Sequence, residues 1–261
     1  MDLGLTNKHA LVTGASSGLG AASAMALARE GATVVINARD ADRLAKAADW
    51  IEGETGNRPG IIAADIATAR GLTAIEKGIR DIPIDILVSN GGGPPPGQFL
   101  EHESARWEDA ARLVLDSARS LTRMVLPGMI DRGWGRLLYI TSVGVLQPVD
   151  DLILSNTYRA GVTAMCKTIS NNYAQHGVTA NCVCPGYTAT ERLMGLATRR
   201  SQETGKTRED ILEEFASMIP RKRVGNPEEL GALVAFLAGE QAGYISGTSI
   251  PVDGGLHKSL L

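Results

Sequence analysis

A glycine-rich turn near the N-terminus has the residue types and the spacing for binding phosphate. The segment Thr13-Gly14-Ala15-Ser16-Ser17-Gly18-Leu19-Gly20 follows a short apolar run. Glycines let backbone amides approach a pyrophosphate closely, and a helix that begins at such a turn presents its positive end. The same turn also occurs without a ligand. Its position after the first predicted strand of an alternating chain favours a bound dinucleotide, held by Gly14, Ser16, Ser17, Gly18, Leu19 and Gly20.

The end of the second apolar run carries the residue that distinguishes NADP from NAD. Arg39 lies 19 residues past Gly20, close to the spacing of about 20 at which a dinucleotide fold reads the adenosine ribose. An acidic residue at this position suits the ribose of NAD, whereas a cation suits the 2′-phosphate of NADP. Asp40, one residue further along, is an alternative candidate for the contact with the ribose. Arg39 could also be an ordinary solvated surface residue. The arginine favours NADP.

Short β-branched runs alternate with helical runs along the chain. The predicted strands cover residues 9–12, 33–36, 60–63, 84–88, 135–140, 178–183 and 248–252. The predicted helices cover the segment up to about 30, then 42–54, 69–78, 104–132, 153–175 and 227–237. This alternation predicts an α/β fold, in which residues 1–261 form a single domain with a doubly wound parallel sheet of about seven strands and helices on both faces. Ligands of such sheets bind at the carboxyl ends of the strands.

Composition and charge narrow the classes of partner. The 261 residues are 44% hydrophobic and 21% charged, with a formal net charge of −3, so neither nucleic acid nor an anionic membrane is an expected partner. No apolar run approaches the ~18 to 20 residues of a membrane span, and the first residues lack a signal-peptide core. Three cysteines without spaced pairs predict reduced thiols, a cytoplasmic location and no metal site.

The turn TGASSGLG resembles the phosphate loop of the short-chain dehydrogenase/reductase family. Further resemblances follow the later predicted strands, although Ser89-Asn90-Gly91-Gly92 departs from the family's Asn-Asn-Ala-Gly element at two positions. The resemblance covers nearly the whole chain. It implies a Rossmann fold and an NADP cofactor contacted by Asp65, Ile66, Asn90, Gly91, Gly92, Pro185, Gly186, Thr188 and Thr190.

The active-site positions implied by this resemblance depart from the family pattern. The family uses a Ser, a Tyr thirteen residues later and a Lys four residues after the Tyr, with a helical Asn upstream. Ser142 matches the serine, whereas Ser155 and Arg159 stand at the Tyr and Lys positions and Val114 at the Asn position. The resemblance therefore implies a catalytic set of Ser142, Ser155 and Arg159, with Arg159 also contacting the cofactor.

These substitutions alter the proton chemistry. A serine hydroxyl is a far weaker acid than a phenol, whose pKa is about 10. Arg159 keeps the positive charge, but a guanidinium does not titrate and cannot take part in a proton relay as Lys can. Tyr158 and Tyr187 lie near enough in the sequence pattern to replace the missing acid. We expect Tyr158 to be a packed aromatic residue and not an acid. For Tyr187, packing and a role as the substitute acid both remain open.

The sequence thus predicts an enzyme that transfers hydride between NADP(H) and a small carbonyl or alcohol substrate, by resemblance a 3-oxoacyl-type reductase, with a non-standard proton path. Two alternatives are an NADP-binding protein without redox activity, acting as a sensor or structural subunit, and a non-redox enzyme on the same fold. The polar segment 188–224 is expected to form a substrate lid. The resemblance also implies a homodimer or homotetramer that packs through the helices near 105–132 and 153–175.

Overall fold

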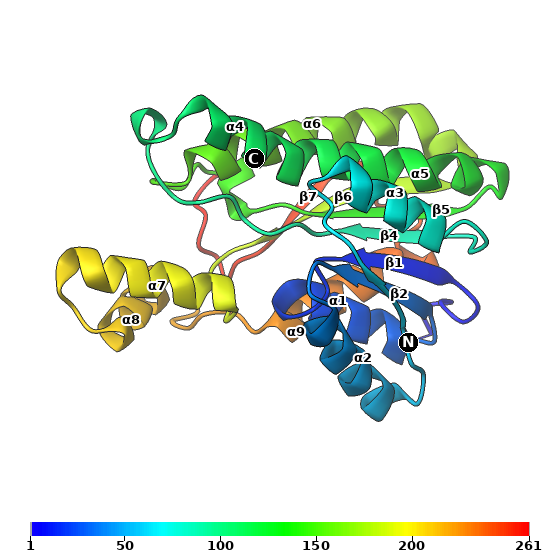
Figure 1. Cartoon of the computed structure of the whole chain (residues 1–261), viewed down its shortest axis with the longest axis horizontal. Helices are drawn as coiled ribbons and strands as arrows, with labels where there is room; N and C mark the ends of the chain where they lie inside the picture. The colour runs from blue at the N-terminus through cyan, green and yellow to red at the C-terminus, as the bar shows by residue number, and fades with distance from the viewer. Residues whose placement is uncertain (1, 261) are drawn as a thin grey trace.

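A parallel sheet runs through the centre of the molecule (Figure 1). The computed structural model describes residues 2–260, and within them the strands pair in the order β3-β2-β1-β4-β5-β6-β7. The chain winds outward from β1 in one direction and then from β4 in the other, so the switch point lies between β1 and β4. The strands are β1 His9–Thr13, β2 Thr33–Ala38, β3 Gly60–Ala63, β4 Ile86–Ser89, β5 Gly135–Ile140, β6 Val178–Pro185 and β7 Ser249–Val252. The predicted doubly wound fold is confirmed.

Helices cover both faces of the sheet, so its central strands are buried on both sides. All six residues of β5 are buried, which is the pattern of a strand packed on both sides. One face carries α1 Gly18–Arg29, α2 Ala41–Thr55 and α9 Pro227–Ala238. The other carries α3 Ala69–Gly78, α4 Ser104–Ala111, α5 Ser117–Asp131 and α6 Ile153–Tyr173. No helix within residues 2–260 is both long and apolar enough to cross a bilayer.

The helix predicted over 104–132 is confirmed, with one irregular turn inside it. A π-helical turn, η2 (Arg112–Asp116), separates α4 from α5. The Ser117 hydroxyl donates to the Leu113 carbonyl oxygen at 2.6 Å, which supplies a partner for a carbonyl displaced from the regular ladder. Val114 is buried in this turn. Apolar periodicity did not reveal the interruption, because one extra residue per turn leaves the buried face almost continuous.

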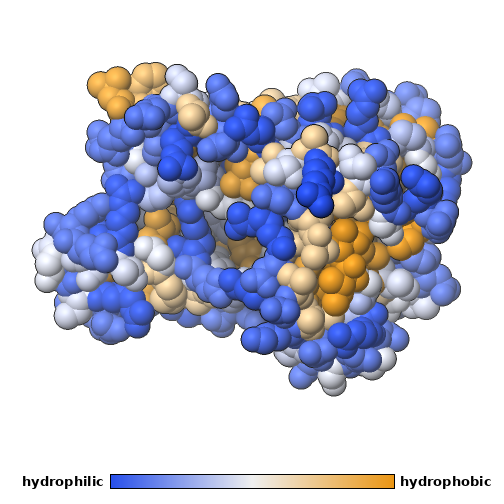
Figure 2. All heavy atoms as spheres, in the orientation of Figure 1, coloured by the Kyte–Doolittle hydropathy of each residue, from blue (hydrophilic) through white to orange (hydrophobic). Residues whose placement is uncertain are grey.

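The polar segment forms two helices that stand apart from the sheet, α7 (Glu191–Thr204) and α8 (Arg208–Met218), seen at the left of Figure 1. They share a small apolar core made by Leu193, Ala197, Ile211 and Phe215. Figure 2 shows that the molecule is hollowed between this pair and the body that contains the sheet. The prediction that this stretch is helical and contains no strand is confirmed for the residues that the structure describes.

Candidate functional site

The turn after β1 is shaped by glycine. Gly14 and Gly18 have positive φ angles of 58° and 55°, and a Cβ atom on Gly20 would overlap the Gly14 carbonyl oxygen. Ser17 occupies the N-cap position of α1, yet its side chain makes no capping hydrogen bond. The backbone N–H groups of the first turn therefore have no side-chain acceptor and are suited to a phosphate.

Asn90 ties the end of β4 to this turn. The Thr13 hydroxyl donates to the Asn90 carbonyl oxygen at 2.9 Å, and the Asn90 backbone N–H donates back to it at 3.0 Å. The Asn90 side-chain amide donates to the Gly14 carbonyl oxygen at 3.2 Å. Next along the chain, a Cβ atom on Gly91 would lie 3.1 Å from the Leu113 carbonyl oxygen, whereas Gly92 faces open space. Asn90 thus holds the turn in place.

Two residues predicted to contact the adenosine part of the cofactor lie at the carboxyl ends of β2 and β3. Asp65 follows β3, where its Oδ1 accepts from the Ala67 N–H at 2.9 Å, and Ile66 beside it is buried. Arg39 follows β2 and is exposed. It makes no hydrogen bond or ion pair with any other residue between 2 and 260. Its guanidinium is therefore available to a ligand.

The segment after β6 joins the cleft to the α7–α8 pair. The Gly186 N–H donates to the Val252 carbonyl oxygen at 3.0 Å, and the Thr188 hydroxyl donates to the Gly186 carbonyl oxygen at 3.3 Å. Thr190 caps α7, since its hydroxyl accepts from the Leu193 N–H at 3.4 Å. A Cβ atom on Gly18 would lie 3.2 Å from the Thr190 methyl carbon. The residues from Pro185 to Thr190 therefore run from the sheet edge to the glycine turn.

The implied catalytic residues lie around the carboxyl end of β5. Arg159 Nε donates to Ser155 Oγ at 3.1 Å, one helical turn away on α6, and Arg159 Nη1 donates to the Ile140 carbonyl oxygen at 2.7 Å. Ser155 is buried. Ser142 follows Ile140 by two residues, and its Oγ accepts from the Gly144 N–H at 3.0 Å. The structure places all three at one strand end, with Ser155 and Arg159 in direct contact.

The charge at this strand end is perturbed. Burial, together with the positive charge of Arg192, lowers the pKa of Arg159 to about 10, and Cys184 opposes this shift. Arg192 comes from α7 and donates to the carbonyl oxygens of Gly93 and Pro94 at 3.1 and 2.7 Å. Burial lowers the pKa of Arg192 as well. The two guanidinium groups therefore lie close enough for their charges to interact.

Both tyrosines proposed as substitute acids have packing partners. Tyr158 meets Trp107 edge to face, with ring centroids 6.1 Å apart. Tyr187 stacks on Phe215 at 4.6 Å, and burial raises the pKa of its phenol. A raised pKa makes the phenol a weaker acid. Both tyrosines are thus engaged in aromatic packing, as expected for Tyr158.

Sequence reasoning missed the arginines that tie α7 to the rest of the molecule. Arg199 Nη1 donates to the Pro96 carbonyl oxygen at 3.0 Å, beside the Arg192 contacts. Arg43, in the first turn of α2, pairs with Glu191 at 2.6 Å. A high density of arginine in the segment 190–224 was the only available signal, and ordinary solvated helices carry the same signal.

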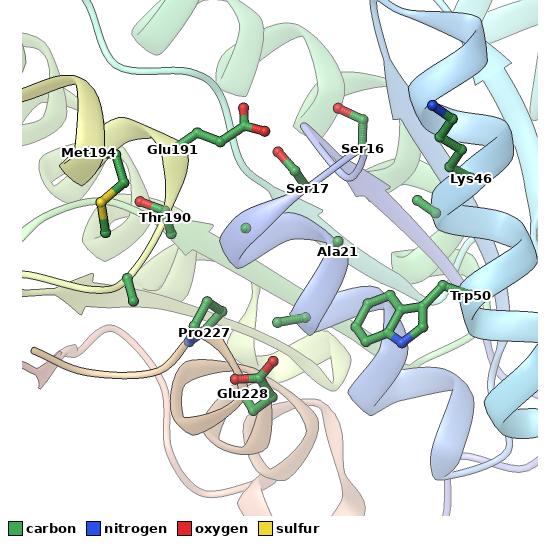
Figure 3. A pocket seen from close by; sticks show the side chains of 14 residues that line it. Ser16, Ser17, Ala21, Lys46, Trp50, Thr190, Glu191, Met194, Pro227 and Glu228 are labelled. Carbon is green, nitrogen blue, oxygen red and sulfur yellow. The ribbon is translucent and has the colours of Figure 1, made fainter.

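A pocket of about 790 Å³ opens where α1, α2 and α7 approach one another (Figure 3). Ser16, Ser17, Thr190 and Glu191 line it on one side, with Lys46 and Trp50 of α2 on the other. No group of three or more His, Cys, Asp or Glu side chains in the described part of the chain is arranged to hold a metal ion.

Comparison with known proteins shows to which family this chain belongs. The family model described as enoyl-(acyl carrier protein) reductase matches residues 14–257. The chain belongs to the short-chain dehydrogenase/reductase family. The nodulation protein G of Azospirillum brasilense is 33% identical, with 97% of this chain and 99% of that protein covered. The acetoacetyl-CoA reductase of Allochromatium vinosum is 32% identical over 95% and 97% of the two chains.

A solved structure resembles the whole chain. The L-sorbose reductase of Gluconobacter frateurii, solved with NADPH and L-sorbose, matches with a TM-score of 0.94 at 33% identity, and the match covers 100% of both chains. The prediction of an oxidoreductase of the short-chain dehydrogenase/reductase family is therefore confirmed.

Proposed function

We propose that this short-chain dehydrogenase/reductase family member uses NADP(H) to reduce a carbonyl substrate, or to oxidise the corresponding alcohol, with Ser142, Ser155 and Arg159 as its catalytic residues. The observation that carries the proposal is the 3.1 Å hydrogen bond from Arg159 Nε to Ser155 Oγ at the carboxyl end of β5. In this assignment Ser155 and Arg159 replace the Tyr and Lys that the family pattern places there. Val114 replaces the helical Asn and lies in the π-helical turn.

The residues present fit the cofactor. A glycine turn that excludes side chains and the uncapped first turn of α1 suit a pyrophosphate. Arg39 suits a 2′-phosphate. A similar reductase, the L-sorbose reductase of Gluconobacter frateurii, was solved with NADPH, which carries that phosphate. The residues assigned to hold NADP(H) are Gly14, Ser16, Ser17, Gly18, Leu19, Gly20, Arg39, Asp65, Ile66, Asn90, Gly91, Gly92, Arg159, Pro185, Gly186, Thr188 and Thr190.

The hydrogen bond between Arg159 and Ser155 provides a path along which a proton can move between the two side chains. NADPH, when bound, supplies the hydride. In reduction, the hydroxyls of Ser142 and Ser155 donate to the substrate oxygen, and Ser155 passes its proton to that oxygen. Arg159 Nε then returns a proton to Ser155 Oγ, and the guanidine regains its proton from solvent. In the oxidation direction each proton moves the other way.

This relay depends on the altered pKa of Arg159. The expectation that a guanidinium stays outside a relay rested on its ordinary pKa, far above neutrality. Here burial and the neighbouring Arg192 lower that pKa to about 10, which is close to the unperturbed pKa of a phenol. Arg159 therefore supports Ser155 in two ways, as a positive charge beside the developing alkoxide and as a proton donor.

The proposal also covers the substrate class, the substrate lid, the location in the cell and the oligomeric state. The acetoacetyl-CoA reductase relative supports a 3-oxoacyl-type substrate, and the segment 188–224 is assigned as the substrate lid. We assign the chain to the cytoplasm because its three cysteines, Cys166, Cys182 and Cys184, are buried free thiols. A homodimer or homotetramer that packs through α5 and α6 completes the proposal.

The test is a titration of the purified protein with NADPH and NADH, followed by a screen of 3-oxoacyl thioesters and other carbonyl compounds. We expect NADPH to bind more tightly and to be oxidised by at least one substrate. Ser155→Ala should lower kcat by about 100-fold or more while the Kd for NADPH changes little. The matched control is Ser104→Ala, an exposed serine at the start of α4. Tight NADPH binding without turnover of any carbonyl compound would instead support a sensor or structural subunit.

A further inference from the structure

Arg43 lies where the cofactor turn, α2 and α7 converge. Its Nη2 atom donates to Ser17 Oγ at 3.1 Å and to Glu191 Oε1 at 2.6 Å. Ser17 belongs to the glycine turn, whereas Glu191 is the first residue of α7 and lies 148 residues away from Arg43. Figure 3 shows Glu191 reaching toward Ser17 across the mouth of the pocket. One guanidinium group thus joins two parts of the cofactor site.

The contact uses the Ser17 hydroxyl in an unusual way. A serine at an N-cap ordinarily accepts from a backbone N–H of its own helix, but Ser17 makes no such bond and accepts from Arg43 instead. This leaves the first turn of α1 open to phosphate and brings a cation to its edge. The Glu191 carboxylate is held against that cation by a charge-assisted bond.

Both cationic and acidic side chains lie near Arg43, and the acidic residues just before it in the chain are Asp40 and Asp42. Arg39 lies four residues earlier and has no partner within residues 2–260, and Lys46 lines the pocket one turn later. Asp40 is occupied as the N-cap of α2, where it accepts from the Arg43 N–H at 3.0 Å. The Glu191 carboxylate is therefore the anion that a ligand would have to replace.

We propose that Arg43, together with Arg39, binds the 2′-phosphate of the cofactor. In the absence of NADP(H), the Glu191 carboxylate occupies the position on Arg43 that this phosphate would take. A phosphate with its two charges and several acceptor oxygens pairs with a guanidinium more strongly than an exposed carboxylate does. Binding of NADP(H), but not of NAD(H), then frees Glu191 from Arg43. This inference rests on the proposed use of NADP(H) and adds to it a specificity residue that is absent from the predicted contacts.

The exchange makes opposite predictions for the two partners. In Arg43→Gln, the Kd for NADPH should rise about tenfold or more, because a charge-assisted contact to phosphate is lost. In Glu191→Gln, the Kd for NADPH should fall several-fold, because the competing anion is gone. The Kd for NADH should change less than twofold in both variants. In the double variant, Glu191→Gln should have no further effect.

The experiment is a fluorescence titration of each variant with NADPH and NADH, together with competition by adenosine 2′,5′-bisphosphate and by adenosine 5′-monophosphate. The bisphosphate should show the same changes as NADPH, and the monophosphate should show none. Arg58→Gln is the matched control, since Arg58 forms exposed ion pairs with Asp49 and Glu52 at the far end of α2. Circular dichroism checks that each variant is folded.

The outcomes separate this inference from the proposed function. If the unaltered protein binds neither dinucleotide, the proposed function fails. If it prefers NADPH but Arg43→Gln weakens NADPH and NADH equally, or weakens neither, the proposed function stands and the role of Arg43 is wrong. Weaker NADPH binding in Glu191→Gln would also overturn the exchange, because it would show that Glu191 assists the phosphate.

Discussion

Arg159 lies at the carboxyl end of β5, where its guanidinium donates to Ser155 and to the Ile140 carbonyl oxygen. As a residue type it carries a permanent charge, but in this fold burial and the Arg192 cation lower its pKa to about 10. The guanidinium contacts Ser155 and the last carbonyl group of β5, and no carboxylate is among the groups that shift its pKa. Its function is therefore sensitive to alkaline pH.

At the residue scale we predict that turnover is independent of Arg159 ionisation between about pH 6 and 9 and falls as the pH rises through about 10. The folded-state pKa is lowered, so the cation is present below about 10 and is lost above it. The same group should make the free energy of unfolding rise above pH 10, since the unfolded chain still binds the proton there. The measurement is kcat against pH with saturating NADPH.

Arg159→Met is the comparison for this profile. It should lower kcat at every pH and remove the alkaline decline, because no guanidinium remains to deprotonate. An alkaline decline that persists unchanged in this variant would assign the ionisation to another group.

At the element scale, the turn after β1 and the helix α2 give opposite predictions for the same substitution. Gly20→Ala places a Cβ atom against the Gly14 carbonyl oxygen, which is rigid backbone. We expect it to lower the free energy of unfolding by about 1–3 kcal/mol and to weaken NADPH binding. Gly53→Ala adds a methyl group in open space within α2 and should raise the free energy of unfolding by about 0.5–1 kcal/mol. Denaturant unfolding measures both.

The link between α7 and the loop after β4 provides a second prediction at this scale. A Cβ atom on Gly93 would lie 2.6 Å from Arg192 Cζ, so Gly93→Ala displaces the guanidinium from the Gly93 and Pro94 carbonyl oxygens. We expect faster trypsin cleavage within residues 191–218 and a lower kcat, with the melting temperature nearly unchanged. Gly53→Ala in α2 is the control, because nothing lies within 4 Å of its added methyl group and Gly53 is not among the residues assigned to the cofactor. Equal cleavage of the two variants would show that Arg192 does not hold α7.

At the scale of the whole molecule, the exposed face of α5 and α6 is the proposed subunit contact. It carries a groove of about 480 Å³ lined by Leu126, Ile130 and Tyr173 together with Arg123 and Asp131. We predict that light scattering coupled to gel filtration gives two or four times the mass of one chain. Ile130→Glu should shift the protein toward a monomer without loss of near-UV circular dichroism.

Trp50→Glu is the control for this prediction, since Trp50 is 42% exposed on the opposite side of the sheet. Its oligomeric state should match that of the unaltered protein. A monomer before any substitution would contradict the proposed assembly.

The sequence determined the fold because its information is local and repeated. Alternating apolar runs predicted each strand of the described sheet, and right-handed crossovers favoured a doubly wound arrangement, while the strand order itself comes from the structure. The glycine turn was also readable, since a turn that excludes side chains requires glycine at particular positions. The π-helical turn at Arg112–Asp116 was not predicted, because the buried face stays almost continuous across it.

Only the tertiary structure decided which charges meet. Arg192 and Gly93 are 99 residues apart, and Arg43 and Glu191 are 148 apart. No spacing rule connects such pairs, since a long side chain reaches its partner only after the elements have packed. The pKa of Arg159 belongs to the same class, because burial and a neighbour from another helix set it. The sequence therefore determined the framework and the phosphate turn, and tertiary packing decided the electrostatics of the site.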